Sequence, residues 1–534
     1  MVVPRLTWPA KAHGGAAHLL LLLLLHAATG SAAFARDALQ SADVPTPAPT
    51  VNPCAPVTAT NASWLSGAQG LAPLALQLLR AAPEHGLDVR RYQVDELTRR
   101  LAGPEGTSAA FVRDLDRAMV QYLCDLHGGR AAWASRVSAA PDTGFDPRQR
   151  LATVRDARGL AQAVDAAAPA IPLYGRVKAA LAQYRALYEA TPAWPALPPV
   201  ARAAIHAGEP YAGAALLQAR LQLLGDLDAQ APMGSDGIYT PALAGAVRRF
   251  QARHGLDEDG VLGTATVTAL SVPPAHRIAQ LALTLERLRW LPPPPAHGRV
   301  VVVNVPTYRL WTFDARDNFA EHSLEMRVIV GARGRTPTPL FIGEMRYLEF
   351  APYWNVPASI QKSEIVPKLA RNPAYLQQND MELVGSDGRV LQVGAGDVAS
   401  RLRAGGARVR QRPGPRNVLG DVKFALPNPM NIYLHSTSAR ELFKRTHRDL
   451  SHGCIRVEQP AELAQFVLAD SQQWSGAQVT AAMSAGKNRF VKLAEPVPVV
   501  LFYATALVDR QGRALFAPDI YGRDAALIAA LQLE

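Results

Sequence analysis

Cys454 and the histidines that precede it are the residues whose types and spacing could carry chemistry. Cys454 lies in DLSHGCIRVEQP (449–460), two residues after His452, and it is the only cysteine in the last three-quarters of the chain. His435 ends the apolar stretch NIYLH, with enough residues in between for the backbone to return beside Cys454, and His447 is a further imidazole. Three roles are open for Cys454: nucleophile, metal ligand, or small hydrophobe in a core.

A nucleophile is the role that the neighbouring residues favour. Structural zinc sites need four ligands in compact pairs, and only one thiolate is present here, so no metal is expected. A free thiol with a pKa of about 8.5 needs a nearby imidazole to accept its proton, and His435 can be that base. The amides around Gly453 could hold an oxyanion. Arg456 could bind a carboxylate, either of a substrate or of the protein itself.

The first 35 residues have the order of a secretory signal peptide. A positively charged start precedes AAHLLLLLLLHAATG, and the small residues SAAFA follow. We therefore expect cleavage after Ala35, with Ala33 as the second choice, and export of the mature protein. An uncleaved membrane anchor is the alternative, although the apolar core is short for a membrane span and His26 interrupts it.

Export changes the interpretation of the three cysteines. Cys54 and Cys124 both lie in the N-terminal part, far from Cys454. In an oxidising compartment, a disulfide between the first two would leave Cys454 as a free thiol.

The formal net charge of +11 and the pI near 9.7 permit attraction to a polyanion. The basic residues are scattered, and no motif that combines basic and aromatic residues appears, so nucleic acid is not an expected partner. An acidic polymer of the cell envelope fits an exported basic protein better.

A chain of 534 residues is too long for one core, and its patterns predict a multidomain α+β protein. After the signal peptide (1–35) we expect a Pro-rich linker (36–63), a helical scaffold (64–200), a small helical domain (211–271), a connecting helix with a Pro-rich linker (272–298), a mainly β domain (299–490) that contains a polar insertion (358–412), and a C-terminal strand and helix extension (491–534). An insertion of this length in a β domain is typical of a lid or a loop that covers a substrate.

Residues 211–271 contain a short repeat, DGIYTPALAGAV from Asp236 and DGVLGTATVTAL from Asp259. Together with LLQARLQLLGDL and RRFQARHGLDE, this stretch closely resembles the three-helix peptidoglycan-binding domain. Its hallmark is LQ..L..LG, DG, FQ...GL and DG..G..T, and the one departure is Ile-Tyr-Thr after the first DG. A helical spacer is the alternative interpretation of this region.

The combination of Y-x-H-x-T and S-H-G-C-I-R-V resembles the active-site signature of L,D-transpeptidases. The resemblance extends over YWNVPASIQ, RPGPRNVLGDVKF, YLHSTSARELF and FAPDIYGRD. With the helical scaffold and the peptidoglycan-binding repeat, most of the chain is similar to the large periplasmic members from Gram-negative bacteria.

This resemblance implies a role for each matching residue. Cys454 would be the nucleophile and His435 the general base, with Tyr433 and the amides of Gly453 and Cys454 around the oxyanion. The implied substrate-binding residues are Arg456, His452, Ser451, Trp354 and Asn355, and the 358–412 insertion would be a mobile cap over the site.

The implied reaction forms a 3→3 cross-link in peptidoglycan. The thiolate would attack the third residue of a tetrapeptide stem, usually meso-diaminopimelate, release D-alanine, and pass the acyl group to the diaminopimelate amine of another stem. No cofactor is needed, carbapenems are implied acylators, and a periplasmic monomer is expected, with other cell-wall synthesis enzymes as further candidate partners.

Several alternatives stay open at this point. The same two residues could serve an L,D-carboxypeptidase, an exchange of D-amino acids, or attachment of a protein to murein. A papain-like peptidase is disfavoured by chain order, because there the cysteine precedes its histidine. A non-catalytic peptidoglycan-binding scaffold predicts a lost nucleophile or base, and neither residue is lost.

Overall fold

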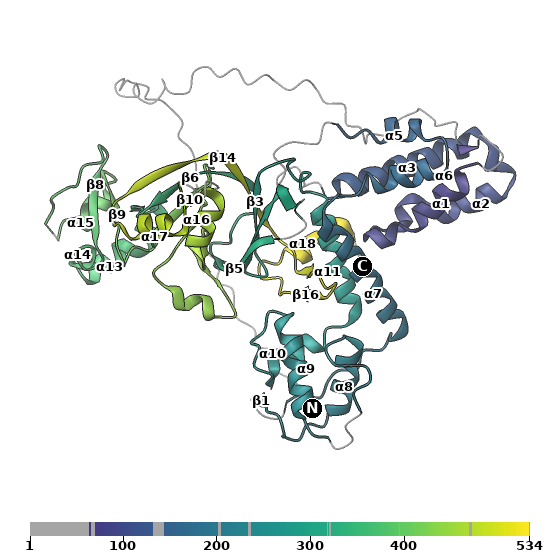
Figure 1. The fold of residues 1–534 in the computed structure, drawn as a ribbon, viewed down its shortest axis with the longest axis horizontal. Helices are drawn as coiled ribbons and strands as arrows, with labels where there is room; N and C mark the ends of the chain where they lie inside the picture. The colour runs from purple at the N-terminus through teal and green to yellow at the C-terminus, as the bar shows by residue number, and fades with distance from the viewer. Residues whose placement is uncertain are drawn as a thin grey trace, which may run out of the picture. The chain divides into compact units, whose positions relative to one another are not determined.

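The computed structural model describes residues 64–65, 70–131, 144–200, 204–232, 237–317, 319, 322–394, 396–468 and 473–532 (Figure 1). Within these residues, helices dominate before the connecting segment and strands dominate after it, which confirms the predicted multidomain α+β class. The predicted signal peptide and the whole of the predicted linker, including Cys54, lie outside the described residues.

The N-terminal helices pack around a core of their own. The longest of them begins where the Ser108 hydroxyl accepts a hydrogen bond from the Phe111 NH at 3.1 Å, an N-cap that satisfies a free amide. Cys124 lies on this helix and is disulfide-bonded. The helices around this core are α1 (Ala72–Arg80), α2 (Val94–Ala102), α3 (Ala109–Gly128), α5 (Pro147–Thr153) and α6 (Ala157–Asp165), with the short η2 (Ala82–His85), η3 (Val89–Tyr92) and η4 (Pro104–Thr107).

A second helical pair does not belong to that core. α7 (Pro172–Ala190) packs on α11 (Pro274–Leu288), and their buried residues share a core with β14 (Arg489–Phe502) and β15 (Ala506–Val508). The predicted scaffold of 64–200 therefore combines two packing units. Helical periodicity identified α7 as a helix, but it could not show that its apolar face covers strands from the end of the chain.

The small domain after α7 has three α-helices, α8 (Ala214–Leu223), α9 (Pro241–Ala252) and α10 (Thr264–Leu270). Two short strands, β1 (Ala204–Ile205) and β2 (Leu262–Gly263), pair in antiparallel fashion beside them. The second Asp-Gly of the repeat forms a tight turn, in which Gly260 has φ of 69°. A Cβ atom at Gly260 would lie 2.8 Å from the Ala244 carbonyl oxygen, so the turn needs glycine.

The C-terminal half is built on a nine-stranded sheet with the order β12-β5-β13-β11-β10-β6-β14-β3-β4. The sheet closes on itself because β4 also pairs with β5. Helices α16 (Pro460–Leu468) and α17 (Gly476–Ser484) add apolar residues to its core. The strands are β3 (Arg299–Asn304), β4 (Arg309–Asp314), β5 (His322–Gly331), β6 (Ile342–Phe350), β10 (Val422–Ala425), β11 (Leu434–His435), β12 (Asp449–Ser451), β13 (Ile455–Val457) and β14.

The boundary predicted between residues 490 and 491 falls inside β14 and is wrong as a domain boundary. β14 pairs with β6 on one side and with β3 on the other, so it lies within the sheet. The residues after it, β16 (Ala514–Phe516) and α18 (Arg523–Leu531), follow β15. The physical reason is that strand pairing between distant segments leaves no mark on local composition.

The predicted insertion is a compact subdomain with a core of its own, which we call the cap (residues 354–411). Its sheet has the order β7-β9-β8, and β7 lies before the predicted start of the insertion at residue 358. Helices pack around this sheet (Figure 1). The cap elements are β7 (Trp354–Asn355), α12 (Ala358–Ile360), the π-helical η6 (Gln361–Ile365), α13 (Val366–Arg371), α14 (Tyr375–Gln378), β8 (Met381–Gly385), α15 (Val398–Arg403) and β9 (Ala407–Gln411).

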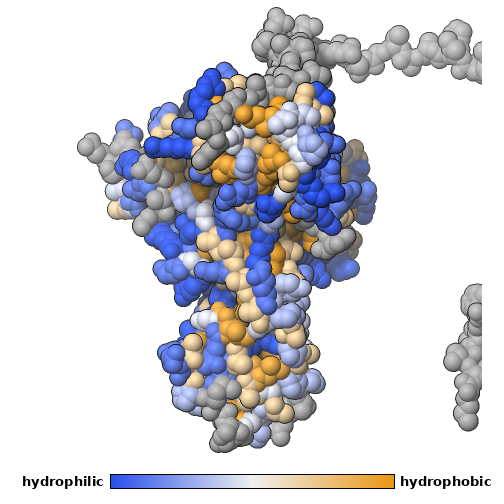
Figure 2. All heavy atoms as spheres, turned by 90° about the vertical axis from the view of Figure 1, so that its right-hand side faces the viewer, coloured by the Kyte–Doolittle hydropathy of each residue, from blue (hydrophilic) through white to orange (hydrophobic). Residues whose placement is uncertain are grey.

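The surface shows no large division into polar and apolar faces in the view of Figure 2, where hydrophilic and hydrophobic residues are interspersed. Among the described residues, none of the helices combines the length and the apolar character that crossing a bilayer requires.

Candidate active site around Cys454

Two adjacent parallel strands bring the predicted catalytic residues together. In the pairing of β11 with β13, Leu434 lies opposite Ile455 and His435 lies opposite Arg456. Side chains alternate along a strand, so His435 and Arg456 lie on the same face of the sheet. Tyr433 and Cys454, two residues before them, continue this face, and the Ile455 NH donates to the Tyr433 carbonyl at 3.1 Å.

A tight turn between β12 and β13 presents Cys454. Gly453 has φ of 113°, which residues with a side chain rarely adopt. A Cβ atom at residue 453 would lie no closer than 3.5 Å to another side chain, the nearest being Ile432, which is an ordinary van der Waals distance. The backbone conformation, and not a lack of space, is therefore the reason that glycine is needed here. The Ser451 hydroxyl accepts from the Gly453 NH at 3.1 Å and donates to the Cys454 carbonyl at 2.5 Å. The Thr338 hydroxyl donates to the Gly453 carbonyl at 2.8 Å.

These contacts give Ser451 a structural function in the turn. They also show that the Gly453 NH already has an acceptor, so the NH would have to leave Ser451 before it could bind an oxyanion.

Cys454 is a free, half-buried thiol. Its Sγ donates to the Asn431 carbonyl at a sulfur–oxygen distance of 3.6 Å. Burial raises the pKa of the Cys454 thiol, while the NH and the hydroxyl of Tyr433 act in the opposite direction by stabilising the thiolate. The thiol therefore needs a base to become a nucleophile at neutral pH.

His435 is buried and neutral. Burial, with smaller contributions from Arg456 and Lys423, lowers its pKa from 6.5 to about 3, although the carbonyls of Ser436 and Leu419 favour the protonated ring. Nδ1 lies 2.6 Å from the Ser436 carbonyl oxygen. Since a carbonyl oxygen only accepts hydrogen bonds, Nδ1 carries the proton and Nε2 keeps a lone pair. Such a ring is available as a base.

Tyr433 and Lys423 complete the surroundings of the thiol. The Tyr433 ring meets the His435 ring edge-on, with 5.7 Å between the ring centres. The Lys423 ammonium lies over the Tyr433 ring at 4.7 Å from its centre, and it also pairs with Glu349 at 3.6 Å. Sequence reasoning missed Lys423, because a single lysine in the strand sequence VKFALP carries no signal of its own.

Arg456 supplies positive charge to the same face. Burial lowers its pKa, and the thiolate form of Cys454 and the carboxylate of Glu441 partly offset this effect. Its Nε atom is buried and has no hydrogen-bond partner among the residues that the structure describes. A buried donor without an acceptor is costly, which favours a ligand with an oxygen acceptor at this position.

The other predicted site residues contact the cap or belong to it. His452 is exposed at the turn, and its Nε2 lies 2.5 Å from Oε1 of Glu364 in the cap. Trp354 packs against the cap core, and Asn355 is exposed on β7, which pairs with β9. The structure therefore brings Cys454, His435, Tyr433 and Arg456 together and places Trp354 and Asn355 in the cap sheet.

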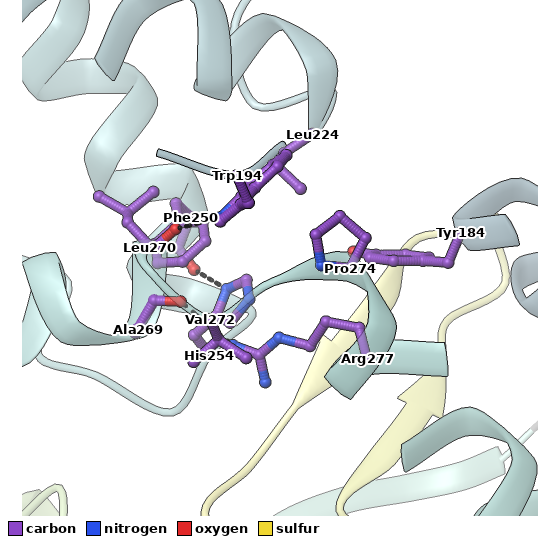
Figure 3. Close-up of a pocket in the computed structure, with 10 residues that line it drawn as sticks. All are labelled: Tyr184, Trp194, Leu224, Phe250, His254, Ala269, Leu270, Val272, Pro274 and Arg277. Carbon is purple, nitrogen blue, oxygen red and sulfur yellow. Dashed lines mark hydrogen bonds between the residues drawn. The ribbon is translucent and has the colours of Figure 1, made fainter. Parts of the chain in front are cut away.

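Two cavities elsewhere in the molecule contain neither Cys454 nor His435. The one in Figure 3 is lined by the buried His254, which stacks on Phe250 with 3.7 Å between ring centres. Its volume of about 10 Å³ is that of a single water molecule, so His254 serves packing there. The other cavity has a volume of about 760 Å³ and includes His447 in its lining. Within the described ranges, no three His, Cys, Asp or Glu residues are grouped so as to hold a metal ion.

Three segments of the chain match known protein families. Residues 298–497 match the L,D-transpeptidase catalytic domain, residues 212–270 match a "Putative peptidoglycan binding domain", and residues 60–181 match a scaffold domain.

Individual proteins are also similar to parts of this chain. A Haemophilus influenzae protein named "Putative L,D-transpeptidase" is 32% identical over 245 residues, which cover 46% of this chain and 48% of that protein. The chain thus spans about half the length of this relative. Two solved L,D-transpeptidase structures are similar to this chain. The structure from Xylanimonas cellulosilytica is 18% identical, and the match covers 57% of this chain and 100% of that chain with a TM-score of 0.17. The structure from Stackebrandtia nassauensis is 12% identical, and the match covers 56% of this chain and 94% of that chain with a TM-score of 0.22.

The family matches agree with the order of segments along the chain: helices first, then the three-helix domain, then the closed sheet that carries Cys454. The chain therefore contains an L,D-transpeptidase catalytic domain, preceded by a scaffold domain and a peptidoglycan-binding domain.

Proposed function

We propose that this protein forms 3→3 cross-links in peptidoglycan through a thioester on Cys454. The observation that carries the proposal is the free Cys454 thiol on the same face of the sheet as a buried, neutral His435. The peptidoglycan-binding domain supports peptidoglycan as the substrate.

In the first half-reaction, His435 accepts the thiol proton while Cys454 attacks the diaminopimelate carbonyl of a tetrapeptide stem. A tetrahedral intermediate forms, and its oxyanion is bound by the Cys454 NH and the Tyr433 hydroxyl. The bond to D-alanine then breaks, His435 returns the proton to the departing amine, and the thioester remains. Arg456 and Lys423 provide positive charge for the carboxylate of the leaving D-alanine.

In the second half-reaction, the diaminopimelate amine of another stem attacks the thioester. A C–N bond forms, the C–S bond breaks, and the proton lost by the amine returns through His435 to the Cys454 sulfur. The amine competes with water, so exclusion of water by the cap favours transfer over hydrolysis. Hydrolysis, exchange of D-amino acids and attachment of a protein use the same thioester and differ in the acceptor.

The reaction places the protein in the periplasm, where the stem peptides are. The predicted signal peptide supports this location, and the match to a peptidoglycan-binding domain agrees with it.

Incubation of the purified protein with disaccharide-tetrapeptide tests the proposal. The expected product, measured by mass spectrometry, is a dimer that has lost one D-alanine. Disaccharide-tripeptide as the only product would instead indicate an L,D-carboxypeptidase, and unchanged substrate would contradict both activities. Disaccharide-pentapeptide serves as a control, since the proposed enzyme requires a stem with D-alanine at position four as the terminal residue.

The rate of acylation is expected to stay level from about pH 5 to about pH 8. The base must be neutral, and the pKa of His435 is lowered from 6.5 to about 3, so the ring remains neutral as the pH falls through 6.5. The acid limb of the rate profile then lies near the lowered pKa, not at 6.5. Stopped-flow measurement of acylation by a carbapenem across this range, with circular dichroism to confirm folding, checks the prediction. A half-loss of rate near pH 6.5 would contradict it.

A further inference from the structure

The cap reaches the catalytic turn through the carboxylate of Glu364. Its Oε1 atom lies 2.5 Å from Nε2 of His452. His452 is two residues before Cys454, and two residues of chain span at most about 7 Å. The Glu364 carboxylate therefore contacts the turn that carries Cys454.

The backbone that carries Glu364 has an unusual conformation. Glu364 belongs to η6, a π-helical turn, and such turns are rare and are frequently found at functional sites. The turn is held from the side of the cap core, where Ile365 is buried and the Gln361 side chain accepts a hydrogen bond from the Val409 NH at 3.0 Å. Glu364 thus extends from a supported backbone toward the catalytic turn.

Charge around Cys454 is divided between the sheet and the cap. Lys423 and Arg456, both on strands of the sheet, contribute positive charge at the thiol. Each of these cations interacts with a carboxylate: Glu349 forms an ion pair with Lys423, and the charge of Glu441 attracts that of Arg456. Glu364 is a carboxylate that comes from the cap. The sheet therefore supplies two cations near the thiol and the cap supplies a carboxylate, each with an oppositely charged neighbour of its own.

The two proposed substrates differ in the same way. The donor stem ends in a carboxylate next to the bond that breaks, which suits the basic side. The acceptor arrives as a primary ammonium, since an alkyl amine has a pKa of about 10.4, and it releases one proton to water before the free amine attacks the thioester. A carboxylate is the side chain that binds such a group by a charge-assisted hydrogen bond.

The structure already shows a primary ammonium on this carboxylate. Nζ of Lys368 lies 3.4 Å from Oε2 of Glu364, while Oε1 is engaged by His452. Both side chains are partly exposed, Lys368 at 44% and Glu364 at 30%, so an incoming ammonium can replace Lys368. Hydrogen bonds from His452 and Lys368 lower the pKa of Glu364 despite its partial burial, which keeps it ionised.

We propose that Glu364 binds the ammonium of the acyl acceptor and that His452 holds the Glu364 carboxylate in position. This assignment rests on the proposed transpeptidase function and concerns only its second half-reaction. It makes the cap a specificity element that selects a cationic amine.

The test separates the two half-reactions with two substrates. The donor is a disaccharide-tetrapeptide whose diaminopimelate amine is acetylated, so it cannot accept. The acceptor is a disaccharide-tripeptide, which has no D-alanine to lose. For Glu364→Gln, we expect the acceptor concentration at half-maximal dimer formation to rise about tenfold, the effect of losing one charge-assisted hydrogen bond. Acylation by the donor and hydrolysis without acceptor should match the unsubstituted protein.

Matched controls exclude a general effect of charge or of cap opening. Asp387→Asn removes one negative charge from an exposed position elsewhere on the cap and should leave acceptor binding unchanged. Hydroxylamine is an acceptor that is uncharged at neutral pH, and its reaction should be the same in Glu364→Gln as in the unsubstituted protein.

Two results would overturn the assignment. One is an unchanged acceptor concentration at half-maximal dimer formation in Glu364→Gln. The other is an equal change for hydroxylamine, or faster hydrolysis without acceptor, which would mean that Glu364 only keeps the cap closed. Failure of the proposed function itself would look different, because the unsubstituted protein would then form no acyl-enzyme.

Discussion

Cys454→Ala is expected to abolish acyl-enzyme formation and to lower the rate of cross-linking by at least about 10⁴-fold. The thioester is the only covalent link proposed between the two half-reactions, and alanine has no atom that can form it. Of the cysteines within the described residues, Cys124 is disulfide-bonded and Cys454 is free, so no second thiol there can substitute. Intact-protein mass spectrometry after incubation with a carbapenem measures the adduct directly.

The control for this substitution is a test of folding. Cys454 lies at the edge of the sheet's core, and loss of its sulfur should cost about 1 kcal/mol of stability, which leaves the fold intact. Thermal unfolding and binding to purified peptidoglycan should therefore be close to those of the unsubstituted protein. An adduct, or any dimer formed by a folded Cys454→Ala variant, would show that the nucleophile lies elsewhere.

His435→Gln is expected to slow acylation by about 10²- to 10⁴-fold, the usual contribution of a general base. Burial raises the pKa of the Cys454 thiol, so little thiolate forms unless a base removes the proton. Glutamine keeps a similar size and can still donate to the Ser436 carbonyl through its amide, but it has no basic nitrogen. Single-turnover measurement of acylation separates this effect from substrate binding.

The matched control is His447→Gln. His447 is exposed and comes from the segment between η7 (Arg440–Lys444) and β12, so the same chemical change there should leave the rate unchanged. Full acylation by a folded His435→Gln variant would contradict the assignment of the base. Recovery of activity at alkaline pH in His435→Gln would support it, because hydroxide then replaces the base in forming the thiolate.

The sequence alone was sufficient for the multidomain α+β class, because helical and strand periodicity are local properties of the chain. It also predicted that the chain could return from His435 to the neighbourhood of Cys454. In the structure, His435 lies on β11, and Cys454 directly precedes β13, the strand that pairs with β11.

The sequence was insufficient wherever distant segments meet. It assigned most of β14 to a C-terminal extension, although the strand pairs with β6 and β3. It also could not show that α7, the helix in which the matched scaffold segment ends, packs on α11. It also described the cap as a covering loop, whereas the cap has a sheet and a core of its own.

What the sequence determined by itself was the identity and order of the reactive groups and the division of the chain into helical and β regions. Only the tertiary structure decided that His435 is buried and neutral, that Lys423 lies over Tyr433, and that Glu364 from the cap meets His452. The reason is physical. Propensity and periodicity act over a few residues, whereas burial, pKa and ion pairing depend on which residues the completed fold brings within a few ångströms of one another.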